Sequence, residues 1–338
     1  TSDSDGNTVA GSNAGEDLVS GNGLNNSFYG KDAGMNVTTG DNSVAVGEGS
    51  LKANTEGSNV VAVGRNALGS NTTSSNSVGV GAYALSAQTT GFNNVACGYN
   101  AAQDLTTGQR CVMLGYEAGR ESTTNHNIVA IGYQALRDNS DGNANSWSGI
   151  VAIGSEAGRS NTANNGTYIG FRAGQSSGDA ASQIAIGFES GQNNQGIDNI
   201  SIGLKAGYTN GSHPDGLSFS NAYNIAIGRT AGYGSSASGR DNLMLGRSAM
   251  YNRTSGSENC VLGKQAGKAI TTADNCVIIG ADAGNTGTNN LTTGSNNILI
   301  GHDAAASSAT VSNEITLGDS NISSLRCQVQ TISSLSDE

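Results

Sequence analysis

The chain has 338 residues, of which 50 are glycine, one is proline and 13% are charged, against roughly 25% charged residues in an ordinary globular protein. The formal net charge is −11 at pH 7 and the 16 basic residues are scattered, which argues against a nucleic-acid partner because phosphate binding needs clustered Lys and Arg. No apolar run in the sequence approaches the roughly 18 residues that span a bilayer, so we expect no membrane insertion.

A short motif recurs along almost the whole chain. The stretch "NSVAVGEGSL" at 42–51 returns as "NVVAVGRNAL" at 59–68 and "NSVGVGAYAL" at 76–85, and the interval from one unit to the next is mostly 17. Valine or isoleucine at alternate positions indicates a strand, and the Gly, Asn and Thr that follow indicate turns. We therefore predict an all-β fold, a parallel β-solenoid with one coil per unit. The glycines that close the apolar runs, called anchor glycines below, are Gly11, Gly30, Gly47, Gly64, Gly81, Gly98, Gly115, Gly132, Gly154, Gly170, Gly187, Gly203, Gly228, Gly246, Gly263, Gly280, Gly301 and Gly318.

The anchor glycines also give the domain organisation. Three intervals, 132 to 154, 203 to 228 and 280 to 301, are longer than the others, and the repeat resumes in phase after each. We interpret the extra residues as loops inserted between intact coils. The predicted parts are irregular N-terminal coils at 1–40, a solenoid at 41–318 with insertions at 138–149, 208–223 and 285–295, and a C-terminal segment at 319–338.

Each predicted strand has two faces that need different partners. We expect the outer pair, such as Val44 and Val46, to form the core of the coil, and the middle residue, such as Ala45, to point outward. The middle positions are small or apolar in most coils, which predicts a stripe that packs against copies of the same chain in a homotrimer. The stripe comprises Ala45, Ala62, Ala96, Met113, Ala130, Ala152, Ala185, Met244, Val261, Ile278 and Leu299.

The repeats carry a family resemblance. "NSVAVGEGS" resembles the N-S-V-A-I-G-x-x-S motif in the head repeats of trimeric autotransporter adhesins, which implies a left-handed parallel β-roll in a homotrimer. The longer repeat of this chain resembles repeats of phage tail fibres and related bacterial surface proteins, and the likeness covers approximately residues 5–318.

The end of the chain adds a second resemblance. Ser336, Asp337 and Glu338 are similar to the start of the S-D-x-R-x-K motif that opens the intramolecular chaperone domain of phage tail fibres and tailspikes. That resemblance places Ser336 at the position of the self-cleavage nucleophile. Because the lysine that serves as its base is absent from the chain, we expect no self-cleavage and interpret the chain as a mature or truncated fibre product.

Titratable residues give little sign of catalysis. His126, His213 and His302 fall in different units, without a neighbouring Cys or carboxylate at the spacing of metal ligands. We therefore expect no enzyme activity, no metal and no cofactor. A pair of carboxylates formed between coils would still allow a polysaccharide depolymerase, which stays as the least favoured alternative.

The residue just after the anchor glycine forms rows in successive coils. These rows would either stabilise the solenoid by stacking or, in the case of the tyrosines, bind sugar rings. The insertions hold the only tryptophan and other bulky residues, which serve either as contact sites or as packing onto the rod. The rows are Tyr99, Tyr116 and Tyr133, then Phe171 and Phe188, then Arg229, Arg247 and Lys264; the candidates in the insertions are Trp147, His213, Phe219 and Tyr223.

These features together predict a structural and adhesive protein. Our leading hypothesis is a homotrimeric phage tail fibre in the virion, a rigid rod that presents loops to a host-surface glycan or protein and contacts other tail or fibre proteins. The alternative is a bacterial cell-surface adhesin or a self-assembling extracellular fibril.

Overall fold

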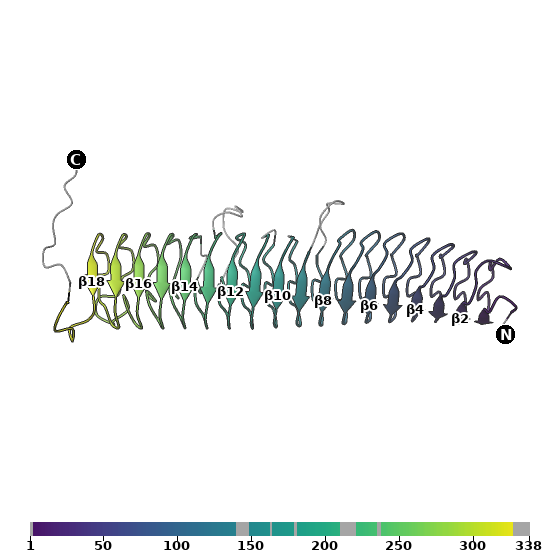
Figure 1. Cartoon of the computed structure of the whole chain (residues 1–338), viewed down its shortest axis with the longest axis horizontal. Helices are drawn as coiled ribbons and strands as arrows, with labels where there is room; N and C mark the ends of the chain where they lie inside the picture. The colour runs from purple at the N-terminus through teal and green to yellow at the C-terminus, as the bar shows by residue number, and fades with distance from the viewer. Residues whose placement is uncertain are drawn as a thin grey trace, which may run out of the picture.

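In the computed structural model the chain is a straight stack of coils with its two ends at opposite ends of the rod (Figure 1). The structure describes residues 3–139, 149–162, 164–178, 181–209, 221–234 and 238–326. This part contains 18 strands and no helix, and thus no helix long and apolar enough to cross a membrane. The strands are β1 (Thr8–Ala10), β2 (Ser27–Tyr29), β3 (Val44–Val46), β4 (Val61–Val63), β5 (Val78–Val80), β6 (Val95–Cys97), β7 (Val112–Leu114), β8 (Val129–Ile131), β9 (Val151–Ile153), β10 (Thr167–Ile169), β11 (Ile184–Ile186), β12 (Ile200–Ile202), β13 (Ile225–Ile227), β14 (Leu243–Leu245), β15 (Cys260–Leu262), β16 (Val277–Ile279), β17 (Ile298–Ile300) and β18 (Ile315–Leu317).

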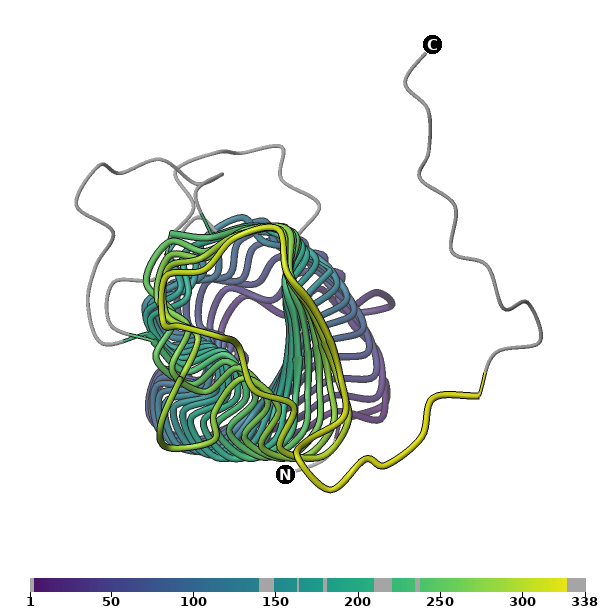
Figure 2. The same cartoon turned by 90° about the vertical axis from the view of Figure 1, so that its left-hand side faces the viewer.

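All the strands belong to one parallel sheet that runs the length of the rod. Each strand pairs with the strands before and after it in the chain, so that Ala45 of β3 lies beside Ala62 of β4. The register survives the first insertion, where Val129 of β8 pairs with Val151 of β9. Viewed from one end, the coils have similar closed outlines, and each is slightly offset from the next along the rod (Figure 2). The predicted parallel β-solenoid is confirmed, with one coil for each repeat unit of the sequence.

The repeated anchor glycine is explained by its backbone and its neighbours. Gly47 has φ of 127°, a conformation that side chains rarely adopt, and a Cβ there would lie 2.7 Å from the carbonyl oxygen of Gly64 in the next coil. Two and four residues later the chain is left-handed again, at Gly49 (φ 66°) and Leu51 (φ 52°). These corners turn the chain back onto itself after every strand.

Hydrogen bonds join the coils outside the strands as well. The N–H of Leu51 donates to the carbonyl of Ala67 in the next coil (3.0 Å), although neither residue lies in a strand. Within the coil the N–H of Ser50 donates to Gly47 (3.3 Å), which closes a turn. Backbone groups are thus paired between coils around much of each turn, which makes the stack stiff.

The prediction for the two faces of the strands is wrong. The middle residue points into the rod, and the outer pair faces solvent: Ala45 is fully buried, whereas the exposed fraction of Val46 is 37%. The coil is narrow, and its interior is already occupied from the opposite wall by side chains such as Leu51 and Leu68. Two β-branched residues per strand do not fit there, but one small residue does. All the residues assigned to the outward stripe are buried instead: Ala45, Ala62, Ala96, Met113, Ala130, Ala152, Ala185, Met244, Val261, Ile278 and Leu299.

The core is filled by complementary sizes on its two walls. In β4 the small Ala62 is followed six residues later by Leu68, and both are fully buried. In β7 the large Met113 is followed six residues later by Gly119, and a Cβ on that glycine would collide with the Met113 sulfur. In these two coils a large side chain comes from one wall and a small residue from the other, whereas the coil of β14 buries a methionine on each wall, Met244 and Met250.

One core position carries a buried cation. Arg253 is 1% exposed, and burial lowers the pKa of its guanidinium to about 10. The guanidinium donates to the carbonyl of Gly239 (2.6 Å) and to Oδ1 of Asn221 (2.9 Å). Both acceptors also receive a bond from Nδ2 of Asn224, at 3.0 and 3.1 Å. Arg253 forms no ion pair with any described carboxylate.

Candidate functional site

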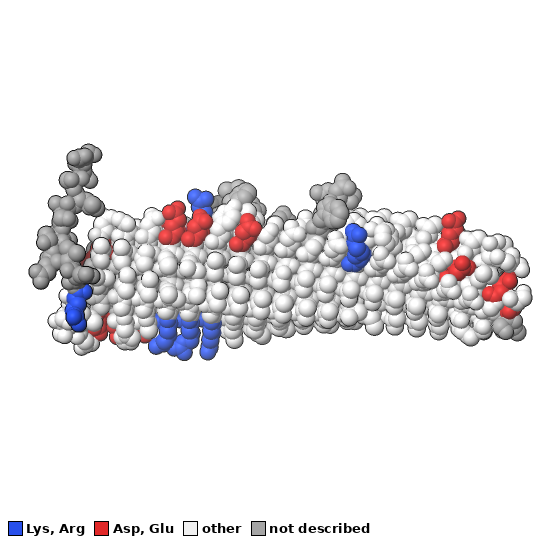
Figure 3. Space-filling model, in the orientation of Figure 1, with Lys and Arg blue, Asp and Glu red and all other residues white. Residues whose placement is uncertain are grey.

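The largest candidate surface is the outer face of the sheet. Its two columns of Val, Ile and Leu are exposed to solvent, with exposed fractions such as 37% for Leu243 and 44% for Leu262. Figure 3 shows this face with very few charged atoms over the strands. Eighteen strands about 4.8 Å apart, each three residues of about 3.3 Å, give a face of roughly 80 Å by 10 Å. An apolar strip of this extent is typical of a protein interface rather than of the surface of a monomer.

The predicted tyrosine row exists and is stacked. The ring centroids of Tyr99 and Tyr116 are 5.6 Å apart, and those of Tyr116 and Tyr133 are 5.4 Å apart, with interplanar angles of 16° and 10°. The three rings are 44 to 49% exposed. Because each inner ring face is covered by the neighbouring ring, the row offers edges and hydroxyls rather than faces on which a sugar would stack. The geometry therefore favours stabilisation of the solenoid.

Two further aromatic rows accompany it. Phe171 and Phe188 stack at 5.2 Å, as their spacing predicted. The sequence analysis missed Tyr208, Tyr233 and Tyr251, whose centroids are 5.1 and 4.8 Å apart and nearly parallel. The signal was available in the sequence, because each of these tyrosines lies five residues after an anchor glycine.

A network of charged side chains links neighbouring coils beside the first insertion. Glu117 pairs with Arg137 (2.9 Å), Asp138 pairs with Arg159 (3.1 Å), and the network continues beyond them to the next coil. The Glu117 carboxylate also raises the pKa of the adjacent Tyr116 phenol. Alternating charges of this kind hold coils together, and each pair adds little by itself at the surface.

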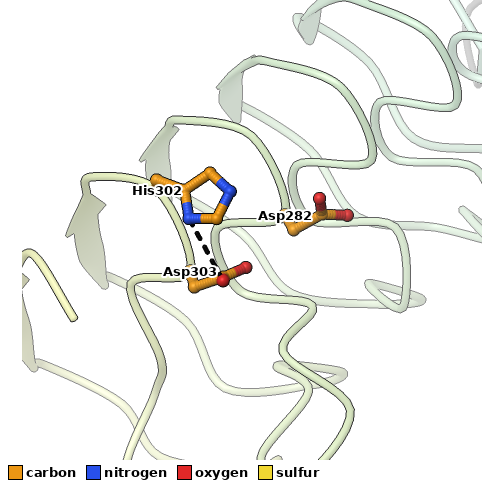
Figure 4. A group of neighbouring side chains, drawn as sticks. All are labelled: Asp282, His302 and Asp303. Atoms are coloured by element: carbon orange, nitrogen blue, oxygen red, sulfur yellow. Dashed lines mark ion pairs between the residues drawn. The ribbon is translucent and has the colours of Figure 1, made fainter. Parts of the chain in front are cut away.

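His302 has carboxylate neighbours that the sequence analysis did not foresee. Asp303 lies 3.1 Å from its Nδ1, and Asp282 of the preceding coil completes a group whose ligand atoms lie within 4.8 Å of one another (Figure 4). The expectation that no histidine has an acidic neighbour is therefore wrong for this residue. Asp282 is also paired with Lys264 (3.3 Å), and the His302 side chain is 68% exposed. The group is open to water and partly neutralised by the ammonium, unlike a built metal or catalytic centre.

A shallow groove of about 390 Å³ lies along the turns of the coils that contain β3 to β6. Its lining is polar, with Asn66, Ser86 and Gln103, and it includes the ring of Tyr83. The Arg65 guanidinium lies 4.7 Å above that ring. Saccharides are bound by amide and hydroxyl groups beside an aromatic ring, and this groove offers that combination. It is therefore our candidate for a glycan contact.

The bulky residues of the insertions are only partly placed. Trp147, His213, Phe219 and the C-terminal Ser336 lie outside the described residues. Tyr223 is described, and it is 44% exposed just before β13. The third insertion, 285–295, contains the fully buried Leu291, so part of it belongs to the core.

Comparison with protein families finds none that matches the chain, and comparison with curated proteins finds no match either. The function must therefore be inferred from the surfaces of the rod and from the resemblance of its repeats.

Proposed function

We propose that the chain is the shaft or head of a homotrimeric phage tail fibre, which holds recognition loops away from its base on a rigid rod. The observation that carries the proposal is the apolar outer face of the sheet, which runs from β3 to β18 with Thr167 of β10 as its one hydroxyl-bearing outer residue. Its area of roughly 800 Å² is what one partner contributes to a standard pairwise interface, and a trimer would divide this area between two neighbours. This face takes the role that the sequence analysis gave to the middle residues of the strands.

Display is the mechanism of such a rod. Hydrogen bonds between the coils keep each chain straight, and side-by-side copies repeat every recognition group around the axis. Weak contacts with a repetitive host surface then add up through avidity. The number three comes from the resemblance to trimeric head repeats, and the bound surface molecule is a glycan or a protein. The polar groove beside Tyr83 is the candidate glycan contact.

Sedimentation equilibrium of the purified chain tests the association. We expect a stable trimer, and the double variant Leu243→Glu, Leu262→Glu should dissociate it, because both side chains lie exposed on the apolar face. The matched control is Asn252→Glu, which adds a charge at an exposed turn outside the strands. Circular dichroism should show that all three proteins remain folded.

Two outcomes would count against the proposal. A stable monomer at micromolar concentration would leave the apolar face without a partner and would refute it. Continuous filaments in electron microscopy, with a mass per length of a single chain, would favour the extracellular fibril instead.

A further inference from the structure

The two edges of the sheet face carry different side chains. The residues five positions before each anchor glycine stack into a column that we call the entry edge. The residues directly after each anchor glycine form a second column, the exit edge. Most entry positions are Asn, but in the coils of β14 and β15 they are Asp241 and Glu258. The exit positions of the same two coils are Arg247 and Lys264. All four are exposed, and Figure 3 shows acidic groups along one border of these strands and basic groups along the other.

Residues on opposite edges of one coil cannot pair within the chain. They are six residues apart across a strand, a distance of roughly 20 Å. Glu258, Arg229 and Arg247 form no ion pair with any other described residue, while Asp241 lies 3.6 Å from Arg240 and Lys264 lies 3.3 Å from Asp282. The edges therefore leave charges that a second copy of the chain can neutralise.

The match between the edges extends beyond opposite charges. In the coil of β7 the entry residue is Arg110 and the exit residue is Tyr116, whose ring faces are covered by Tyr99 and Tyr133 but whose hydroxyl can accept a hydrogen bond from a guanidinium. In the coil of β13 the order is reversed, with Tyr223 at the entry edge and Arg229 at the exit edge. Four coils thus have entry and exit residues that are chemically complementary. Asp198 before β12 is the exception, because its coil has Leu204 at the exit edge.

Symmetry decides which arrangement uses this match. Rotation about the rod axis places the entry edge of one copy against the exit edge of the next, with both rods pointing the same way. Rotation about a perpendicular axis reverses one rod and places each edge against its like, so the basic row meets no acidic row. Around a closed ring, a shift of one coil at every contact would accumulate and prevent closure, which requires copies at equal height.

We infer that copies of this chain associate side by side, parallel and in register around the rod axis, with Asp241 contacting Arg247 and Glu258 contacting Lys264 of the next copy. Arg110 lies against Tyr116 and Tyr223 against Arg229 in the same assembly. The apolar face supplies the contact area, and the edges determine the direction of the chains. The inference rests on the self-association in the proposed function and adds direction and register to it.

A charge swap tests the edge pairs. The variant Arg247→Glu, Lys264→Glu places acids on both edges, and we expect the dissociation constant of the assembly to rise at least tenfold. Adding Asp241→Lys and Glu258→Lys restores the complementarity with reversed signs, and should bring the constant back to within about threefold of the original. The matched control is Lys268→Glu, in the same coil as Lys264 but away from both edges.

A native cysteine reports the direction of the chains. Cys97 is exposed on the sheet face at the end of β6, whereas Cys111 and Cys276 are buried. In a parallel assembly the Cys97 residues of all copies lie at one height, and a short bis-maleimide should join them. The experiment uses a Cys260→Ala, Cys327→Ser background, which removes the half-buried thiol of Cys260 and the thiol of Cys327, a residue outside the described part of the chain.

The outcomes separate this inference from the proposed function. A monomeric wild-type chain overturns both. If the wild-type chain is a stable oligomer, three results overturn only the inference. These are a dissociation constant that the charge reversal leaves unchanged, a full swap that fails to restore it, and the absence of a Cys97 crosslink. If the reversal leaves the oligomer intact but abolishes binding to an acidic polysaccharide such as alginate, the basic row is a ligand site rather than an edge contact, and the inference fails.

Discussion

The inward orientation of the middle strand residue makes a quantitative prediction at Met113 and Gly119. Met113→Ala removes three heavy atoms from a fully buried position and should destabilise its coil by about 2 to 5 kcal/mol. Gly119→Leu should also destabilise, by roughly 1 to 3 kcal/mol of overpacking, because its side chain would collide with the Met113 sulfur. The backbone itself accepts leucine, since Leu68 occupies the equivalent position with φ of 50°, close to the 59° of Gly119.

The two substitutions together recreate the pattern of Ala62 and Leu68. We expect the double variant to recover about 0.5 to 3 kcal/mol relative to the sum of the single changes. Hydrogen exchange of the amides in β6 to β8 is the suitable assay, because a solenoid opens locally and a single global transition is not guaranteed. If the effects of the two substitutions on stability simply add, Met113 and residue 119 do not share one cavity. If Met113→Ala leaves hydrogen exchange unchanged but alters the oligomeric state, Met113 lies on the surface and the inward orientation is refuted.

Three further predictions concern single buried or perturbed groups. Arg253→Met should change stability by no more than about 1 kcal/mol, because both of its acceptors keep another donor, whereas Arg253→Ala should be clearly less stable in denaturant titrations. Burial raises the pKa of the Cys111 thiol to about 11 from 9.0, so the unfolded state loses this proton first and stability should fall between these pH values. The fall should be smaller in Cys111→Ala, and an equal fall in both proteins would contradict the assignment. Finally, Glu117→Gln should lower the pKa of Tyr116, measured by difference absorbance at alkaline pH; an unchanged titration would show that the carboxylate does not act on the phenol.

The period of the sequence was sufficient for the fold but not for the orientation of its strands. Regular anchor glycines and alternating Val and Ile predicted the strands of the solenoid from residue 41 onward and their parallel stacking, whereas β1 and β2 lie in the part that we expected to be irregular. Alternation alone does not say which face is inside when both faces are apolar, as at Val44, Ala45 and Val46. The deciding signal lies six residues later: Leu68 follows Ala62, whereas Gly119 follows Met113. Such exchange of sizes indicates two residues that share one cavity.

The interaction surfaces were less accessible from the sequence. The tyrosine row after the anchor glycines was predicted, but whether its ring faces are free depends on the stacking of Tyr99 on Tyr116, which spacing alone does not reveal. The group around His302 needs the fold, because Asp282 belongs to the preceding repeat unit and only the stacking of coils brings the two side chains together. The edge pairs were visible as residues six apart, such as Asp241 and Arg247, but had no meaning until the outward face of the strand was known.

The hydrogen bonds that join one coil to the next have a consequence for the evolution of the sequence. Each coil presents the same backbone groups to its neighbours, so the duplication or deletion of one whole repeat unit leaves every remaining bond intact. Removing residues 65–81, for example, would join Gly64 to Ala82 with the repeat still in phase. The rod would become shorter by one step of about 4.8 Å at constant width. Duplication or deletion of whole repeats therefore changes the length of the rod in equal steps.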